Sequence, residues 1–170
     1  MWYVVQVATG QEQAAVDMIC EAAADSPALK ECFCPRYKTG EKHGGAWQTV
    51  EKVLFPGYII VVTNQIERVE QGLRGVKAFT RLLGNDKAFV PLSKDEMAWI
   101  DAFTQKDDRT VQMSEGYVDG GKLVITAGPL LHHEGLIRKV NHRKKRAYLQ
   151  VKMFGRLVNA EVGLSIKRKN

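Results

Sequence analysis

Cysteines are few in this sequence, and the three present, Cys20, Cys32 and Cys34, cannot all pair with one another. Two of them are separated by a single residue, which argues against a disulfide framework. Long hydrophobic runs are also missing. The opening MWYVVQVATG has no basic segment and only a short apolar stretch, so it predicts neither a signal peptide nor a membrane anchor. We therefore expect a cytoplasmic protein with reduced thiols and no membrane contact.

The sequence also lacks the motifs that mark common enzymes, because it has no phosphate-binding glycine loop, no nucleophile elbow and no His-Glu metalloprotease helix. Cys32 and Cys34, even with Cys20 or His43, do not have the paired knuckle spacing of a structural zinc site. The His-His-Glu run at 132–134 has no second pair of ligands. We expect no catalysis, no bound metal and no cofactor.

Charge is distributed unevenly along the chain. Residues 121–170 hold 12 Lys/Arg and 2 Asp/Glu, a balance of +10, whereas residues 1–120 hold 13 and 17, a balance of −4. Solubility alone does not require such a step. We expect the C-terminal third to meet an anionic partner.

Strand and helix patterns alternate over the first 105 residues. Val, Tyr and Trp favour a strand over 2–8, and Thr9 with Glu12 predicts a capping box for the helix that follows. Extended segments 31–39 and 47–54, around the glycines of 40–45, predict a hairpin. A core strand is expected over 58–62, a helix over 64–73 and a short strand over 79–83. The last expected element is a helix that runs from a Ser93–Glu96 capping box to Gln105. This order predicts an α/β domain.

The pattern changes after residue 105. Residues 106–116 are charged and lack apolar periodicity, which predicts a flexible linker. From Tyr117 onward, strand-like runs separated by turns predict a small five-stranded barrel. The runs cover residues 123–126, 136–140, 148–154, 157–162 and 164–167. In the third run, alternation places Leu149, Val151 and Met153 inside and sends Tyr148, Gln150, Lys152 and Phe154 outward.

A series of motifs along the whole chain resembles the NusG family in order and spacing. They are WYVVQ at 2–6, FPGYIIV at 55–61, PLSKDE at 91–96, Gly-Pro at 128–129, Gly135 and MFGR at 153–156. The resemblance implies an α+β fold. Its N-terminal NGN domain would be an α/β sandwich, a mostly antiparallel sheet with flanking helices, joined by a flexible linker to a small five-stranded β-barrel KOW domain. The implied boundaries are 1–105, 106–116 and 117–170.

The resemblance also implies a partner for the NGN domain, the tip of the clamp helices in the largest subunit of RNA polymerase. By position, the apolar pocket for these helices involves Trp2 or Tyr3, Phe55, Pro56 and Tyr58. Aromatic side chains on a glycine-proline turn expose large rigid surface at little entropic cost, which agrees with an interface role. The alternative that these aromatic side chains simply fill the core stays open.

Four consecutive cations at 143–146 lie between two strand-like runs, and therefore at the tip of an expected hairpin. Adjacent like charges repel, whereas RNA supplies closely spaced phosphates whose released counterions favour binding. Tyr148 is available to stack on an unpaired base. The predicted RNA-binding residues are Arg138, Lys139, His142, Arg143, Lys144, Lys145, Arg146, Lys152 and Arg156. The alternative is a solvated basic turn that serves solubility alone.

Two further positions in the KOW domain have implied partners. Phe154 matches the phenylalanine that contacts termination factor Rho or ribosomal protein S10, and His133 lies in the loop after Gly-Pro that contributes to the same surface. That loop reads LLHHE at 130–134, where the family usually has aromatic residues, so this chain resembles a specialised paralogue. Its basic KOW domain resembles the LoaP group, whose antitermination depends on an RNA hairpin in the nascent leader.

Our leading interpretation is a monomeric elongation or antitermination factor, tethered to polymerase by the NGN domain while the basic KOW domain contacts structured leader RNA. A linker of about ten residues would raise the local concentration of a weak RNA site. Two alternatives remain open. One is a general NusG factor that couples polymerase to S10 or Rho through Phe154. The other is a KOW-type RNA-binding protein of ribosome assembly that never meets polymerase.

Overall fold

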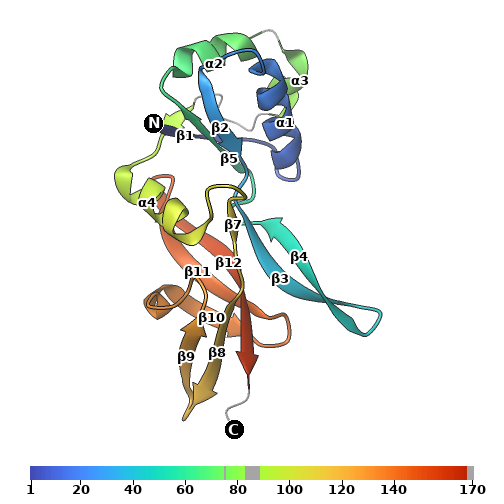
Figure 1. Cartoon of the computed structure of the whole chain (residues 1–170), viewed down its shortest axis with the longest axis vertical. Helices are drawn as coiled ribbons and strands as arrows, with labels where there is room; N and C mark the ends of the chain where they lie inside the picture. Colours follow the sequence, from blue (N-terminus) through green and yellow to red (C-terminus); the bar gives the residue numbers. More distant parts are fainter. Residues whose placement is uncertain (75, 83–88, 168–170) are drawn as a thin grey trace. The chain divides into compact units, whose positions relative to one another are not determined.

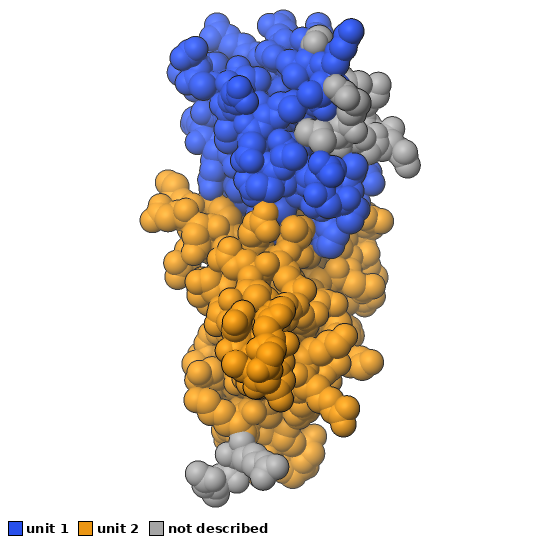
Figure 2. Space-filling model, turned by 90° about the vertical axis from the view of Figure 1, so that its right-hand side faces the viewer, with its two compact units in different colours: residues 1–35, 55–97 blue, residues 36–54, 98–170 orange. Residues whose placement is uncertain are grey.

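The chain forms two compact units in the computed structural model, which describes residues 1–74, 76–82 and 89–167. The first unit comprises residues 1–35 and 55–97, and the second residues 36–54 and 98–170, shown in blue and orange in Figure 2. These units differ from the boundaries 1–105, 106–116 and 117–170, because residues 36–54 and 98–105 group with the C-terminal part. How the chain divides into independently folding domains stays a prediction.

An antiparallel sheet with strand order β2-β5-β1-β6 is the centre of the first unit (Figure 1). β-branched side chains fill this sheet, and Val4, Val5, Ile59, Ile60 and Val61 are buried. Helix α1 packs on β2 and β5. The elements are β1 (Trp2–Gln6), α1 (Glu12–Ala22), β2 (Leu29–Phe33), β5 (Tyr58–Thr63), α2 (Ile66–Leu73), α3 (Lys77–Leu82), β6 (Val90–Pro91) and the start of α4 (Lys94–Phe103).

Two sheets make up most of the second unit: a five-stranded sheet of order β10-β11-β12-β8-β9 and a three-stranded sheet of order β4-β3-β7. The long strand β12 joins the halves of the larger sheet, antiparallel to β11 and parallel to β8, and it also contacts β3. The elements are β3 (Arg36–His43), β4 (Ala46–Val53), the end of α4, β7 (Thr110–Val111), β8 (Ser114–Asp119), β9 (Lys122–Ala127), the 3-10 turn η1 (Glu134–Leu136), β10 (Ile137–Asn141), β11 (Arg146–Met153) and β12 (Arg156–Lys167).

Most expected elements are present, and the α+β class is confirmed. The predicted hairpin is formed by β3 and β4, but its turn is only Gly44 and Gly45, both at positive φ, because residues 40–43 extend β3. The single extended segment expected over 31–39 is instead divided between β2, which pairs with β5, and β3. The Ser93–Glu96 capping box closes with reciprocal hydrogen bonds of 3.0 and 3.2 Å. Buried Leu149, Val151 and Met153 alternate with more exposed residues along β11, as expected. The sandwich arrangement and the barrel's freedom on a linker stay predictions.

The predicted capping box at Thr9 is wrong. Helix α1 begins after Gln11, and the carboxylate of Glu12 instead accepts hydrogen bonds from the backbone N–H groups of Gly10, at 3.0 Å, and Gly57, at 2.8 Å. Glu12 is 3% exposed, so this carboxylate fastens the FPG turn to the start of α1. The spacing of Thr9 and Glu12 predicted a local capping interaction. The Glu12 carboxylate instead accepts a hydrogen bond from the backbone of a residue 45 positions away.

Two other predicted elements differ from the structure. The expected strand over 79–83 is helix α3 over its described residues, because a short apolar run does not distinguish a strand from a buried helical turn. The strands expected at 157–162 and 164–167 form one strand, β12. Gly163, which lies between the two expected strands, continues β12 and is buried in it. Glycine in a strand often marks close approach of another backbone.

The segment expected to be a flexible linker contains ordered elements. Strand β7 pairs with β3 in parallel, and β8 starts at Ser114, which is buried. Arg109 is also buried, and its guanidinium donates to Asp101 on α4 at 2.8 Å. Sequence patterns missed these contacts because the residues are polar and the partners are distant. Flexibility of residues 106–116 in solution stays a prediction.

Candidate nucleic-acid interface

The basic residues at 143–146 begin in a tight turn between β10 and β11. Asn141 and Arg146 are opposite each other at its base, and the Asn141 side chain accepts the backbone N–H of Lys144 at 3.0 Å. Asparagine favours such turns because its side chain replaces a backbone acceptor. Lys145 closes the turn with a φ of +53°. This geometry leaves Arg143 and Lys144 exposed at the tip.

Further cations lie on the strands beside this turn. Arg138 and Lys139 on β10 are exposed, and Lys139 is opposite Tyr148 on β11, which is half-buried. At the other end of β11, Lys152 and Arg156 are exposed near the second turn. The five-stranded sheet therefore displays cations at both ends of β11. The denser group is at the turn.

Lys145 and Arg146, by contrast, face the β3–β4 hairpin. The Arg146 side chain is only 12% exposed, and its guanidinium lies 3.4 Å from the Glu41 carboxylate and 3.5 Å from that of Glu161. The Lys145 ammonium lies 4.3 Å from the ring centroid of Trp47. The sequence pattern predicted one continuous RNA-binding run. The structure divides that run into two exposed cations and two that contact the hairpin.

The hairpin contacts the five-stranded sheet through buried side chains as well as charges. The Tyr37 hydroxyl donates to Glu161 at 2.9 Å, and the Thr39 hydroxyl donates to the Lys145 carbonyl at 3.0 Å. Both side chains belong to β3 and are buried. Burial, the hydrogen bond to Glu161 and its charge raise the pKa of Tyr37 well above the ordinary value. Tyr37 therefore stays neutral and acts as a donor.

Gly163 permits a close approach between β12 and the hairpin. A Cβ atom at this position would collide with the backbone carbonyl of Lys38 on β3. Gly40 also leaves room for a close contact, since a Cβ there would lie 3.2 Å from both the Lys145 side chain and the Trp47 ring. The contact therefore requires glycine at position 163, whereas a Cβ at position 40 would need small shifts of the neighbouring side chains.

The two predicted partner-binding residues occupy different settings. Phe154 and Gly155 form the turn between β11 and β12, with φ values of +58° and +76°. Left-handed backbone is costly for a bulky residue, so Phe154 carries local strain. His133 is exposed but tilts against Phe103 of α4, with ring centroids 4.9 Å apart.

The five predicted polymerase-binding residues lie on β1, β5 and the turn that precedes β5. Pro56 is exposed, while Trp2, Tyr3 and Tyr58 are half-buried. Trp2 contacts Phe33 edge-to-face, with ring centroids 5.7 Å apart. Phe55 is 0% exposed, so a direct contact between its ring and a partner would require this side chain to be uncovered.

Other polar clusters offer little chemistry. Burial raises the pKa of Cys32 far above its ordinary value, and burial with the Asp17 charge raises that of Cys20, so neither is a ready thiolate. Within the described residues, no group of three His, Cys, Asp or Glu side chains suits a metal ion.

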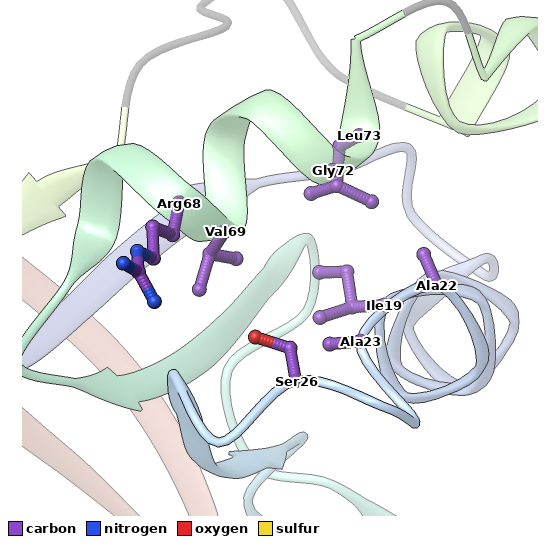
Figure 3. A pocket seen from close by; sticks show the side chains of 8 residues that line it. All are labelled: Ile19, Ala22, Ala23, Ser26, Arg68, Val69, Gly72 and Leu73. Atoms are coloured by element: carbon purple, nitrogen blue, oxygen red, sulfur yellow. The ribbon is translucent and has the colours of Figure 1, made fainter.

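A small pocket between α1 and α2 is shown in Figure 3 and is lined by Ile19, Ala22, Ala23, Ser26, Arg68, Val69, Gly72 and Leu73.

Across residues 1–74, 76–82 and 89–167, no helix is long and apolar enough to cross a membrane.

Comparison with known sequences gives a consistent result. The family model described as "Transcription termination factor nusG" matches residues 1–101. The transcription termination/antitermination protein NusG of Rickettsia felis is 24% identical and aligns with 99% of this chain and 90% of its own length. The NusG of Chlamydia trachomatis is 28% identical over 91% of this chain and 86% of its own length. That of Thermus thermophilus is 25% identical over 96% and 95%.

Comparison with solved structures points to the same fold. A structure titled "Domain interaction in Thermotoga maritima NusG" matches with a TM-score of 0.53 and 18% sequence identity. The match covers 95% of this chain and 92% of that one. Similarity therefore extends over both compact units.

Proposed function

The chain belongs to the NusG family of transcription termination/antitermination proteins, and we propose that it is a LoaP-like, non-catalytic elongation and antitermination factor. In this proposal, the aromatic surface of β1 and β5 binds the clamp helices of RNA polymerase, while the basic turn between β10 and β11 contacts structured leader RNA. The proposed site of action is the bacterial cytoplasm.

The observation that carries the RNA part of the proposal is the exposure of cations around this turn. Lys139, Arg143 and Lys144 are exposed, and Tyr148 lies opposite Lys139. Because Lys145 and Arg146 contact the hairpin, we count about four phosphate contacts with Arg138 included, which predicts a slope of about −3 to −4 for log affinity against log salt. A basic turn that serves solubility alone would show no such slope for a specific RNA.

The proposal is tested by transcription past a terminator, with and without the cognate leader. We expect the double substitution Arg143→Gln plus Lys144→Gln to abolish leader-dependent antitermination and to reduce the salt slope by about 1.4 to 1.8. The matched control is Lys30→Gln plus Lys122→Gln, which removes the same charge from other exposed positions. Equal antitermination by the two double variants would contradict the RNA contact.

The polymerase contact has its own test. Pro56 is exposed and Tyr58 beside it is half-buried, as Trp2 and Tyr3 are. Tyr58→Ala should weaken binding to core polymerase by at least about tenfold, as removal of an interface anchor does. Gln6→Ala is the control, because Gln6 is exposed and opposite Tyr58 on β1. If the wild-type protein shows no affinity for polymerase, the ribosome-assembly alternative replaces this proposal.

One observation favours a second candidate, a general NusG role through S10 or Rho. Phe154 adopts left-handed backbone, and such strain is common where a side chain is held for contact with a partner. Binding of the full-length protein to purified S10, and its loss in Phe154→Ala, would support this role. Absence of binding to both S10 and Rho would exclude it.

A further inference from the structure

The β3–β4 hairpin carries an exposed tryptophan beside the basic turn. Trp47 is 45% exposed, and tryptophan is a residue type enriched at interfaces. Its ring is approached by Lys145, the last residue of the turn, at 4.3 Å. The sequence pattern attributed no role to Trp47, because it lies almost one hundred residues from the basic cluster.

The hairpin is itself basic. Residues 36–54 contain four Lys/Arg and two Asp/Glu, while residues 137–146 contain six Lys/Arg and no acid. One hairpin acid, Glu41, is engaged by Lys52 at 2.6 Å, by His43 at 3.1 Å and by Arg146 at 3.4 Å. Lys42, the position opposite Trp47, is exposed. Two elements with an excess of positive charge are therefore in contact.

This arrangement suits a polyanion that lies across both elements. Their mutual repulsion falls when phosphates neutralise the exposed cations, so a bound anion would favour the contact between hairpin and turn. Single-stranded nucleic acid also offers unpaired bases, which stack on exposed aromatic rings next to cations. An acidic peptide would match the charge, but its Asp and Glu side chains would give Trp47 no aromatic ring to stack on.

We propose that the β3–β4 hairpin and the β10–β11 turn form one RNA-binding surface, in which Trp47 stacks on an unpaired base while Lys42, Arg143 and Lys144 contact phosphates. This inference rests on the proposed RNA function and adds the hairpin to it. Lys145 and Arg146 act as positioning residues, because they hold Trp47 and Glu41 against the turn. Tyr37, Thr39 and Gly163 supply the rest of that contact.

The experiment uses the full-length protein and two synthetic RNAs, a hairpin with an unpaired loop and a fully paired duplex of the same stem. Trp47→Ala should weaken binding to the loop RNA about tenfold, leave duplex binding unchanged and keep the salt slope. Trp47→Phe should retain most of the affinity. Lys42→Gln should reduce the salt slope by about 0.7 to 0.9 for both RNAs.

Leu157→Ala is the matched control, since Leu157 is 64% exposed on β12 and lies beside the other turn of the same sheet. It should change neither affinity. Tryptophan emission should be quenched by the loop RNA, and this quenching should be lost in Trp47→Phe. Thermal melting checks that Trp47→Ala remains folded, as expected for an exposed side chain.

Different results would contradict the proposed RNA function and the proposed role of the hairpin. If Arg143→Gln plus Lys144→Gln has no effect on either RNA, the proposed RNA function itself is wrong. If that double variant weakens binding but Trp47→Ala binds the loop RNA as tightly as wild type, the hairpin is not part of the surface. Tighter binding by Trp47→Ala would also overturn the inference, because the hairpin would then be a competitor of RNA.

Discussion

Gly163→Ala tests the contact between β12 and the β3–β4 hairpin, on which the surface around Trp47 depends. A Cβ atom at position 163 would collide with the Lys38 carbonyl and lie 2.7 Å from the Met113 side chain. Met113 is able to move aside, but the Lys38 carbonyl belongs to the β3 backbone. Overpacking of this kind costs about 1 to 3 kcal/mol.

The lower entropy of the unfolded chain offsets part of this cost, by about 0.5 to 1 kcal/mol for a glycine-to-alanine change. The net loss is therefore up to about 2.5 kcal/mol, which corresponds to a fall in melting temperature of up to about 10 °C for a chain of this size. Urea and thermal unfolding, followed by far-ultraviolet circular dichroism and by tryptophan emission, measure the change. Emission should also report altered surroundings of Trp47.

Gly72→Ala is the matched control. Gly72 lies in α2, has no positive φ, and has no other atom within 4 Å of the point that an alanine Cβ would occupy. The same substitution should therefore stabilise the protein by about 0.5 to 1 kcal/mol. Opposite signs for the two variants are expected. If Gly163→Ala instead matches Gly72→Ala in stability, β12 and the hairpin are not in contact in solution.

Three further outcomes are expected from individual side chains. Glu12→Gln should lower the free energy of unfolding by about 2 kcal/mol, measured by urea denaturation, because the amide removes the negative charge that strengthens the bonds from the N–H groups of Gly10 and Gly57 and replaces one acceptor oxygen with a donor. Tyr37 has a raised folded-state pKa, so its contribution is complete below about pH 10, the unfolded value, and is lost as pH rises above it. The free energy of unfolding, measured as a function of alkaline pH, should therefore fall less steeply for Tyr37→Phe than for wild type. This variant also lacks the hydrogen bond to Glu161. Phe154→Asn relieves about 1 kcal/mol of backbone strain, so its melting temperature should be no lower than that of wild type, and a clear fall would show that ring packing outweighs strain.

Local patterns predicted much of the fold. Alternating apolar residues identified the inward face of β11, and the paired glycines at 44 and 45 identified a hairpin. These features depend on neighbours only a few residues apart. Elements with weak local signals were missed or misassigned, as with α3 and with β7 at residues 110–111. Their conformation is decided by the surfaces on which they pack.

The candidate RNA surface was predicted only in part. A run of cations between two strands indicated a charged turn, and Arg143 and Lys144 are exposed there. The run itself does not reveal that Arg146 meets Glu41, a residue 105 positions earlier. Nor does it reveal that Trp47 lies beside the turn.

The family, the α+β class and the excess of positive charge in the C-terminal third follow from the amino-acid sequence alone, because motifs, periodicity and composition are properties of the chain as written. Which of those charges remain exposed depends on how the chain folds. Contacts between residues far apart in the chain depend on how backbones approach one another, and at Gly163 that approach is possible because no side chain stands in the way.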